Sequence, residues 1–422
     1  MPITTDPDML QTMPDASQTS VRSVALVTPS WPMSHKPNGI VSYTANLREG
    51  LQRLDVRSTV HSLETSADCG DDFVRRFSID SPTFRDKLQL KFSGTIAHET
   101  GIARRFAQSL LRSVEQAGDV ELIEMEESFG WFGQVARDAH VPVVVRLHGP
   151  WFLNGLINGV PEDDAFARRD AAEREGLSLA AGVSSVSYDV LRRVRERYKL
   201  ELPHARVIPN PVPPVAEEDR WSLETCDRNT VLFVGRFDRH KGGDLILDAF
   251  ARILQQKPDA RLILVAPGRG VIDESNTIWS VENYLNRTFP NPRSREQIEV
   301  RGFTKPEEIR KLRRSALLTV VPSRYETFSM TAVEAMSAGC PLVAARVGGL
   351  AEIVTHELNG LTFEGGSAAS LATQIARLLA DPALAEQLGR QARRDCESKY
   401  HPDVVAKMTI DYYADMIKKR SE

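Results

Sequence analysis

The stretch from Thr230 to Leu254, TVLFVGRFDRHKGGDLILDAFARIL, decides the fold of this 422-residue chain. It starts with a short apolar run, passes through a glycine-rich loop, and ends in a segment of helical period. An apolar strand followed by a helix is the repeating unit of parallel sheets that are covered on both faces. The loop places Gly235, Arg236 and Lys241 at the carboxyl end of the predicted strand.

The same alternation of short apolar runs and helical segments continues on both sides of this stretch. Before it come VALVTP, VELIEM, VPVVVRLH and AAGVSSVS, and after it come ARLILVAP, IEVRGF, LLTVVPS and PLVAA. The Pro-rich segment ARVIPNPVPPVAEED separates the two series. Ligands of such sheets bind outside the carboxyl ends of the strands. We therefore predict an α/β protein of two Rossmann-like domains, whose mostly parallel sheets face each other across a cleft.

The domain boundaries are predicted from the breaks in this pattern. We expect a flexible tail at 1–20, a first domain at 21–206, a linker at 207–228, a second domain at 229–400, and a C-terminal helix at 401–422 that crosses back toward the first domain. The tail is polar and rich in Pro and Thr, which is typical of flexible termini. A chain of this length is also too long for one ordinary core.

Composition excludes several classes of protein. Hydrophobic residues make up 41% of the chain and charged residues 26%, as in soluble globular proteins, and the net charge of −4 argues against a nucleic-acid partner. The four cysteines lack metal-ligand spacing, so we expect reduced thiols with neither a zinc site nor a disulfide framework. No apolar run approaches the ~20 residues that cross a bilayer, and the first residues lack the features of a signal peptide. We therefore expect a cytoplasmic protein.

A second stretch, PSRYETFSMTAVEAMSAGCPLVA (Pro322–Ala344), carries the densest group of candidate site residues. Ser329 is a good N-cap and Gly339 is a good stop, so we expect a helix from 330 to 338. The free N–H groups at the start of such a helix, with the helix dipole behind them, make an anion site suited to phosphate. These N–H groups lie around Phe328, Ser329, Met330 and Thr331.

Two glutamates flank this predicted phosphate site, Glu326 in the approach loop and Glu334 about one turn into the helix. Carboxylates accept hydrogen bonds from vicinal hydroxyls, so a nucleotide-sugar fits, with Glu334 at the ribose and Glu326 at the transferred sugar. Arg236 and Lys241 would neutralise the diphosphate and the charge that grows as it leaves. Alternatively, Glu326 is a solvated loop residue, Glu334 is a helix-surface residue, and both cations are surface charges. The surface interpretation is harder to hold for Glu334, because its helix offers little polar face and a buried carboxylate needs a partner.

The segments GRFDRHKGG and PSRYETFSMTAVEAMSAGCPLVA resemble the two signature segments of glycosyltransferase family 4, which are retaining enzymes of the GT-B fold. Weaker similarities extend over most of the chain, in NGIVSYTANLREGL, VVRLHG, VIPNPV and VGGLAEIV. The resemblance implies that Glu326 and Glu334 are the family's paired glutamates, and that Arg236 and Lys241 are its diphosphate-binding cations. The identity of the transferred sugar stays open, because this chain departs from the usual family glycines at Asn38, Thr327 and Ser329.

The resemblance also implies a mechanism, transfer with retention by front-face attack, in which the leaving diphosphate oxygen takes the acceptor's proton. It implies that His148 contacts the donor sugar, and the missing side chain of Gly39 would let backbone N–H groups approach the diphosphate. Since no Asp-x-Asp motif accompanies the phosphate site, we expect metal-independent transfer, with the nucleoside-diphosphate-sugar as co-substrate and no further cofactor. The residues expected to act in catalysis are His148, Arg236, Lys241 and Glu326.

The acceptor is expected to bind mainly to the first domain, and a glycan, a lipid carrier or a small metabolite would each be compatible. Aromatic side chains there could stack on a sugar or heterocycle, or form a wall between the domains. The candidate contacts are Trp31, His35, Glu126, Glu127, Trp151 and Phe152.

Residues 73–112 are rich in basic and aromatic side chains, a composition that is relevant to the kind of acceptor. They carry eight Lys or Arg against three Asp or Glu, with five phenylalanines interleaved. This segment could be a membrane-facing surface for a lipid-linked acceptor, which would place the protein at the inner face of the membrane. A solvated pair of helices beside the cleft is the simpler interpretation.

Three other functions stay open. A nucleotide-sugar epimerase or hydrolase would share the diphosphate site but needs acid and base groups at the sugar's C2, which we do not identify. A nicotinamide dehydrogenase would have G-x-G-x-x-G after the first strand, where this chain has SWPMSHKPNG. A binding protein would have lost turnover, against which the intact Glu326, Arg236 and Lys241 argue. The nucleotide base and the oligomeric state are also open.

Overall fold

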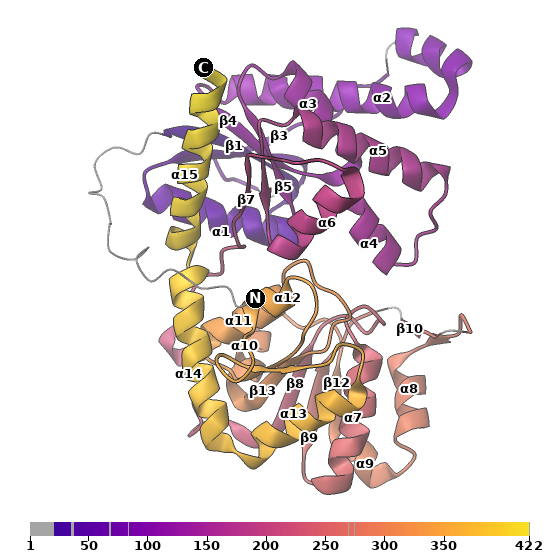
Figure 1. Ribbon diagram of the computed structural model, residues 1–422, viewed down its shortest axis with the longest axis vertical. Coiled ribbons are helices and arrows are strands. Elements are labelled where there is room, and N and C mark those ends of the chain that lie inside the picture. The colour runs from indigo at the N-terminus through magenta and orange to yellow at the C-terminus, as the bar shows by residue number, and fades with distance from the viewer. Residues whose placement is uncertain are drawn as a thin grey trace.

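The computed structural model describes residues 21–34, 38–66, 69–82, 84–268, 270–273 and 275–421, and gives no side chains for 84–98 and 421. Within these residues the chain forms two α/β domains, the first in the upper half of Figure 1 and the second in the lower half. The C-terminal helix α15 (Pro402–Ser421) runs alongside the first domain.

Among the described residues, the first domain holds a seven-stranded sheet of order β3-β2-β1-β4-β5-β6-β7, in which all neighbouring strands run parallel. Its strands are β1 (Ser23–Trp31), β2 (Arg57–Thr65), β3 (Val74–Arg76), β4 (Leu122–Glu126), β5 (Val143–Leu147), β6 (Gly182–Ser185) and β7 (Ala205–Val207). Its helices are α1 (Gly39–Arg53), α2 (Phe84–Gln116), η2 (Ser128–Gly130), α3 (Phe132–Asp138), α4 (Trp151–Ile157), α5 (Asp164–Leu179) and α6 (Tyr188–Tyr198).

The second domain, in its described part, holds a six-stranded parallel sheet of order β12-β9-β8-β13-β14-β15 and a short antiparallel pair, β10-β11. Its strands are β8 (Asp227–Val234), β9 (Arg261–Val265), β10 (Val271–Ile272), β11 (Ile278–Trp279), β12 (Ile298–Arg301), β13 (Ala316–Val321), β14 (Leu342–Ala345) and β15 (Leu361–Phe363). Its helices, with η3 (Glu217–Asp219) before them, are α7 (Gly243–Gln256), α8 (Val281–Thr288), α9 (Pro292–Glu296), α10 (Pro306–Ser315), α11 (Met330–Ala338), α12 (Leu350–Ile353), α13 (Ala368–Ala380) and α14 (Pro382–Lys399). The predicted pair of mostly parallel sheets is confirmed.

The buried central strands explain why the apolar runs in the sequence are continuous. Every residue of β5 (VVVRL) and of β13 (ALLTVV) is buried, as expected when helices cover both faces of a parallel sheet. The stretch Thr230–Leu254 forms most of β8 and α7, and the buried residues of α7 recur at helical spacing. Because β8 and β13 are neighbours in the sheet, the loops that follow them meet at its carboxyl edge.

Helix α15 is anchored to the first domain by packing and by hydrogen bonds. A Cβ on Gly50 of α1 would lie 2.4 Å from the carbonyl oxygen of Pro402, so only glycine fits this contact. The Tyr412 hydroxyl lies 3.0 Å from the carbonyl of Val183 and 2.7 Å from that of His204. The helix therefore belongs structurally to the first domain.

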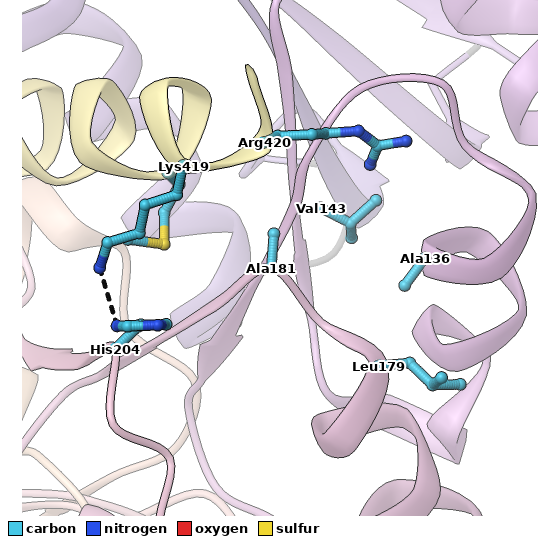
Figure 2. Close-up of a pocket in the computed structure, with 8 residues that line it drawn as sticks. Ala136, Val143, Leu179, Ala181, His204, Lys419 and Arg420 are labelled. Atoms are coloured by element: carbon cyan, nitrogen blue, oxygen red, sulfur yellow. Dashed lines mark hydrogen bonds between the residues drawn. The ribbon is translucent and has the colours of Figure 1, made fainter. Parts of the chain in front are cut away.

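Figure 2 shows the far end of α15, where Lys419 donates to His204 and a small pocket opens beside Arg420. Residues Val143 and Ala181 line this pocket, and they lie where β5 and β6 begin. The pocket is thus at the amino edge of the sheet, opposite the edge where ligands of parallel sheets bind.

Candidate active site

Glu326 lies in the loop between β13 and α11, and its side chain is 7% exposed. Its Oε1 accepts a hydrogen bond from Lys241 Nζ at 2.8 Å and another from the Ser323 hydroxyl at 2.7 Å. Buried charges need such partners, because burial without them is costly. The structure thus brings together two residues that the sequence placed in separate motifs.

The loop after β8 holds Arg236 and Lys241 on one turn. The Asp238 carboxylate accepts the backbone N–H of Lys241 and the Nε of Arg236, each at 2.7 Å. At Gly242 the backbone φ is +73°, and a Cβ would lie 2.1 Å from the carbonyl oxygen of Pro322. Only glycine allows this turn to pack against the start of the loop that carries Glu326. The Arg236 side chain is 57% exposed and is paired with Asp238.

Helix α11 begins and ends where the sequence predicts, at Met330 and Ala338. The Ser329 hydroxyl accepts the N–H of Ala332, and Gly339 ends the helix in the left-handed conformation. The cap takes the N–H of Ala332, which leaves the first-turn N–H groups of Met330 and Thr331 available to an anion. Phe328 contributes no side chain to such a site, because its ring is buried against Tyr400.

Glu334 differs from the expectation of a carboxylate buried in an apolar helix. Its side chain is 43% exposed and pairs with Arg313 of α10, at 3.0 Å between Oε2 and Nη2. Arg313 is the buried partner, with 3% of its side chain exposed. The apolar residues around Glu334 in the sequence suggested burial. They did not reveal that α10 lies beside α11 and leaves the face of α11 that carries Glu334 partly exposed.

Several residues that hold the Glu326 loop were missed in the sequence. Arg324 forms a two-pronged ion pair with Asp244 of α7, at 2.8 and 2.7 Å. The Tyr325 hydroxyl donates to Asp189 of α6, in the other domain, at 2.9 Å. The neighbouring His240 is half-buried, and burial, reinforced by the charge of Lys241, lowers its pKa. The only signal in the sequence was their position beside Glu326 and Lys241.

His148 follows β5 in the first domain, and its ring packs edge-on against Tyr43 with 4.9 Å between ring centroids. Burial and the charge of Arg146 hold the pKa of His148 well below its usual range, so the ring is neutral. The buried Glu127 accepts the N–H of His148 at 3.0 Å and that of Gly149 at 2.5 Å. Glu127 therefore shapes the turn that presents His148, rather than facing an acceptor as predicted.

Most of the predicted acceptor contacts are engaged elsewhere. Trp31 ends β1 with only 6% exposure and donates from Nε1 to Asp71 at 3.0 Å, and Phe152, also 6% exposed, packs edge-on against Tyr198. Both were predicted to line the cleft and instead belong to the core of the first domain. Glu126 accepts the N–H of Ser128 at 2.6 Å, and Trp151 lies under the guanidinium of Arg169 at 3.9 Å. His35 lies outside the described residues.

Gly39 is the first residue of α1, with open space around it. The N–H groups of Ile40 and Val41 both bond to the Asn38 side chain, at 2.8 and 3.0 Å. A diphosphate that approached here would therefore have to displace this cap, which the sequence prediction did not foresee.

The described part of 73–112 gives no support to a membrane-facing surface, which stays a prediction. Phe77 and Phe106 are buried and stack edge-on with 5.5 Å between centroids, and Phe73 lies under the guanidinium of Arg48. Phe77 and Phe106 thus pack inside the protein and Phe73 is half-buried, while the side chains of 84–98 lie outside the description. In the described chain, none of the helices combines the length and apolarity needed to cross a bilayer. Nor do three His, Cys, Asp or Glu side chains in that part lie close enough to hold a metal ion.

Two buried carboxyls predict a fall in stability as pH rises. Burial, with the nearby Glu126, raises the pKa of Glu127 to about 7, and burial raises that of Glu173 to about 8. In the unfolded chain both ionise near ~4.3. The folded state keeps protons that the unfolded state releases between these values, so stability is lost as pH rises from 5 through 8, on the order of 1 kcal/mol per pH unit for each carboxyl.

Urea titrations at pH 5 to 8 measure this slope. The double variant Glu127→Gln, Glu173→Gln should flatten it, since neither amide titrates. Glu175→Gln removes an exposed carboxylate of the same helix as Glu173 and should leave the slope unchanged. A wild-type stability that rises over this range would contradict the prediction.

Two family profiles match adjacent parts of the chain. One, described as a glycosyl transferase 4-like domain, matches residues 38–211, and the other, described as glycosyl transferases group 1, matches residues 215–395. The first covers most of the first domain, and the second covers the part of the second domain that holds Lys241, Glu326 and α11.

Curated relatives match the chain in part. An uncharacterized glycosyltransferase of Methanocaldococcus jannaschii is 33% identical over 187 residues, which are 44% of this chain and 45% of that protein. A D-inositol 3-phosphate glycosyltransferase of Streptomyces bingchenggensis is 32% identical over 187 residues, 44% of this chain and 40% of that protein. The chain thus matches less than half the length of these relatives.

Among solved structures, HepE of Anabaena in complex with UDP superimposes with a TM-score of 0.68 at 19% sequence identity. The superposition covers 94% of this chain and 100% of that one. At this identity the likeness shows the fold.

Proposed function

We propose that this chain, which belongs to glycosyltransferase family 4 and has the GT-B fold, transfers a sugar from a nucleoside-diphosphate-sugar to a hydroxyl or other nucleophile of an acceptor, with retention. The observation that carries the proposal is the ion pair between the buried Glu326 and the partly buried Lys241 beside the start of α11. It puts three groups at one edge of the sheet, namely a carboxylate that can accept hydrogen bonds from sugar hydroxyls, a cation, and helix N–H groups.

Each group has a role in the proposed transfer. Lys241, Arg236 and the first-turn amides of α11 bind the diphosphate and neutralise the charge that grows on it. Glu326 accepts hydrogen bonds from the hydroxyls of the transferred sugar. Glu334, which is held in place by Arg313, accepts hydrogen bonds from the ribose hydroxyls. The bond from the anomeric carbon to the phosphate oxygen breaks, while the acceptor oxygen bonds to that carbon on the same face.

The acceptor's proton passes to the departing phosphate oxygen, so a strong general base is not required. His148, neutral at the carboxyl edge of the facing sheet, contacts the sugar from the first domain. Two side-chain cations and helix amides supply positive charge at the diphosphate, and this supports metal-independent transfer.

A thermal-shift panel of UDP, GDP, ADP and their glucose or mannose conjugates tests the proposal. A nucleotide at 100 times its Kd should stabilise the protein by about 2.7 kcal/mol, and the matching conjugate should be hydrolysed slowly to free sugar. The anomeric form of the first sugar product, followed by NMR, reports retention. Activity abolished by EDTA would overturn the metal-independent part, and an epimerised conjugate would favour an epimerase instead. No shift with any nucleotide would overturn the whole proposal.

A further inference from the structure

The two domains touch directly beside the Glu326 loop. The carboxylate of Glu352, on α12 of the second domain, accepts the backbone N–H groups of Tyr188 and Asp189 at 2.9 and 2.7 Å. These N–H groups open α6 of the first domain, so a carboxylate from one domain caps a helix of the other. Figure 1 shows α12 on the side of the second domain that faces α6.

A third hydrogen bond crosses between the domains at the same place. The Tyr325 hydroxyl donates to Asp189 Oδ2 at 2.9 Å, and the guanidinium of Arg193 lies 5.1 Å from the Tyr325 ring centroid. Arg193 also donates to Asp189 at 2.8 Å, which fixes the carboxylate that receives the hydroxyl. Tyr325 directly precedes Glu326, so this contact holds the chain one residue from the buried carboxylate.

Two glycines leave the loop no room to shift. The N–H of Gly349 donates to the carbonyl of Glu326 at 2.8 Å, and a Cβ on Gly349 would lie 2.1 Å from the carbonyl oxygen of Thr327 and 3.0 Å from the Cβ of Ser187. At Gly348, with a φ of +45°, a Cβ would lie 2.4 Å from the Glu326 carbonyl oxygen. The turn that starts α12 is thus pressed between the Glu326 loop and α6.

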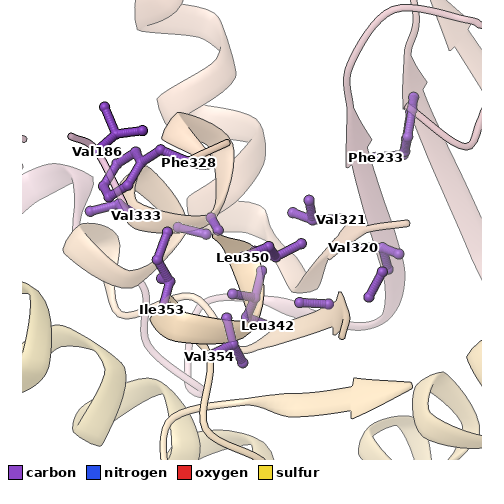
Figure 3. Close-up of a cluster of buried hydrophobic side chains, with 14 of the residues drawn as sticks. Val186, Phe233, Val320, Val321, Phe328, Val333, Leu342, Leu350, Ile353 and Val354 are labelled. Atoms are coloured by element: carbon purple, nitrogen blue, oxygen red, sulfur yellow. The ribbon is translucent and has the colours of Figure 1, made fainter. Parts of the chain in front are cut away.

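Apolar packing continues the contact. Figure 3 shows Val186, which precedes α6, near Phe328 in one cluster of buried side chains, with Leu350 and Ile353 of α12 in the same cluster. Glu352 and Tyr188 are themselves exposed, so a hydrogen bond between them exchanges with water at little net gain. The apolar cluster beside it is buried, and its packing holds the geometry of the contact.

We propose that Glu352 and Tyr325 are positioning residues, which place Glu326 only when α6 of the first domain docks on the second. This inference rests on the proposed function, because it assigns Glu326 to the donor sugar. Docking by Glu352 brings α6 against the turn at Gly348 and Gly349. That turn and Tyr325 then fix the backbone on which Glu326 sits. Closure of the two domains and assembly of the site are in this way one event.

The variants Glu352→Ala, Glu352→Gln and Tyr325→Phe test the inference, the last two changing a few atoms each. Glu357→Ala and Tyr284→Phe are matched controls, because Glu357 pairs with Arg377 and Tyr284 with Asp248, all within the second domain. The readouts are hydrolysis of the conjugate chosen by the panel, the Kd of its free nucleoside diphosphate, and the radius of gyration by X-ray scattering.

We expect kcat for hydrolysis to fall about tenfold or more in the Glu352 and Tyr325 variants, through misplacement of Glu326. The Kd of the nucleoside diphosphate should stay within about twofold, since its proposed ligands all lie in the second domain. The radius of gyration of Glu352→Ala should increase, and both controls should match the wild type.

Wild-type kcat in all three variants, or an unchanged radius of gyration in Glu352→Ala, would overturn the inference. A wild type that binds no nucleoside diphosphate and hydrolyses no conjugate would instead overturn the proposed function. In that case the scattering comparison of Glu352→Ala with its control still decides whether the contact docks the domains.

Discussion

Replacing Lys241 by methionine should lower turnover of the nucleotide-sugar by about a hundredfold or more. The reason is that Lys241 is the better placed of the two cations in the loop after β8: its Nζ lies 2.8 Å from Glu326, whereas Arg236 is more than half exposed and held by Asp238. A cation fixed at a partly buried position stabilises a leaving diphosphate more than one that water screens.

The control is Arg239→Met, which removes an exposed cation from the same turn. Methionine at 241 also leaves the buried Glu326 without its cationic partner, so an effect on folding has to be distinguished from an effect on turnover. Adding Glu326→Gln to Lys241→Met should restore thermal stability, because no unpaired buried charge is left, while turnover stays low. Turnover within about threefold of the wild type in Lys241→Met would show that this ammonium does not neutralise the leaving group.

Local signals in the sequence predicted the elements of the site well. The bounds of α11 were predicted because Ser329, Gly339 and the apolar segment between them act within one short stretch. The alternation of strands and helices likewise predicted both sheets, since each apolar run needs only its own neighbours to be recognised.

The contacts that tie the elements together could not be predicted from the sequence. Glu352 meets α6 across 164 positions and Tyr325 meets Asp189 across 136, and no local pattern specifies such pairs. Trp31 was misplaced for a related reason. It ends an apolar strand, and whether such a ring faces a cleft or the core depends on Phe73, which packs on it from a distant segment. Burial is set by tertiary packing, which periodicity does not reveal.

A buried charged cluster lies near His148, and we expect its disruption to lower stability strongly. Arg146, the last residue but one of β5, is 1% exposed, donates to Asn210 Oδ1 at 2.8 Å and lies 4.5 Å from the Tyr43 ring centroid. Tyr43 donates to the buried Glu124 at 2.7 Å. Burial raises the pKa of Glu124, and the charge of Arg146 opposes that rise. The guanidinium thus offsets part of the cost of burying the carboxyl.

Replacing Arg146 by methionine should lower the free energy of unfolding by about 3 kcal/mol, because Glu124 loses the buried positive charge that offsets its own and the Asn210 oxygen loses its donor. Adding Glu124→Gln should recover part of this loss, since the double variant buries no unpaired charge. Arg206→Met is the control: it breaks an ion pair with Asp415 in which both side chains are well exposed, and should cost less than about 1 kcal/mol. Urea unfolding followed by circular dichroism measures all four proteins. Equal losses in the free energy of unfolding for Arg146→Met and Arg206→Met would contradict the prediction. They would mean that water or a rearrangement of side chains replaces the contacts of Arg146 in the buried cluster.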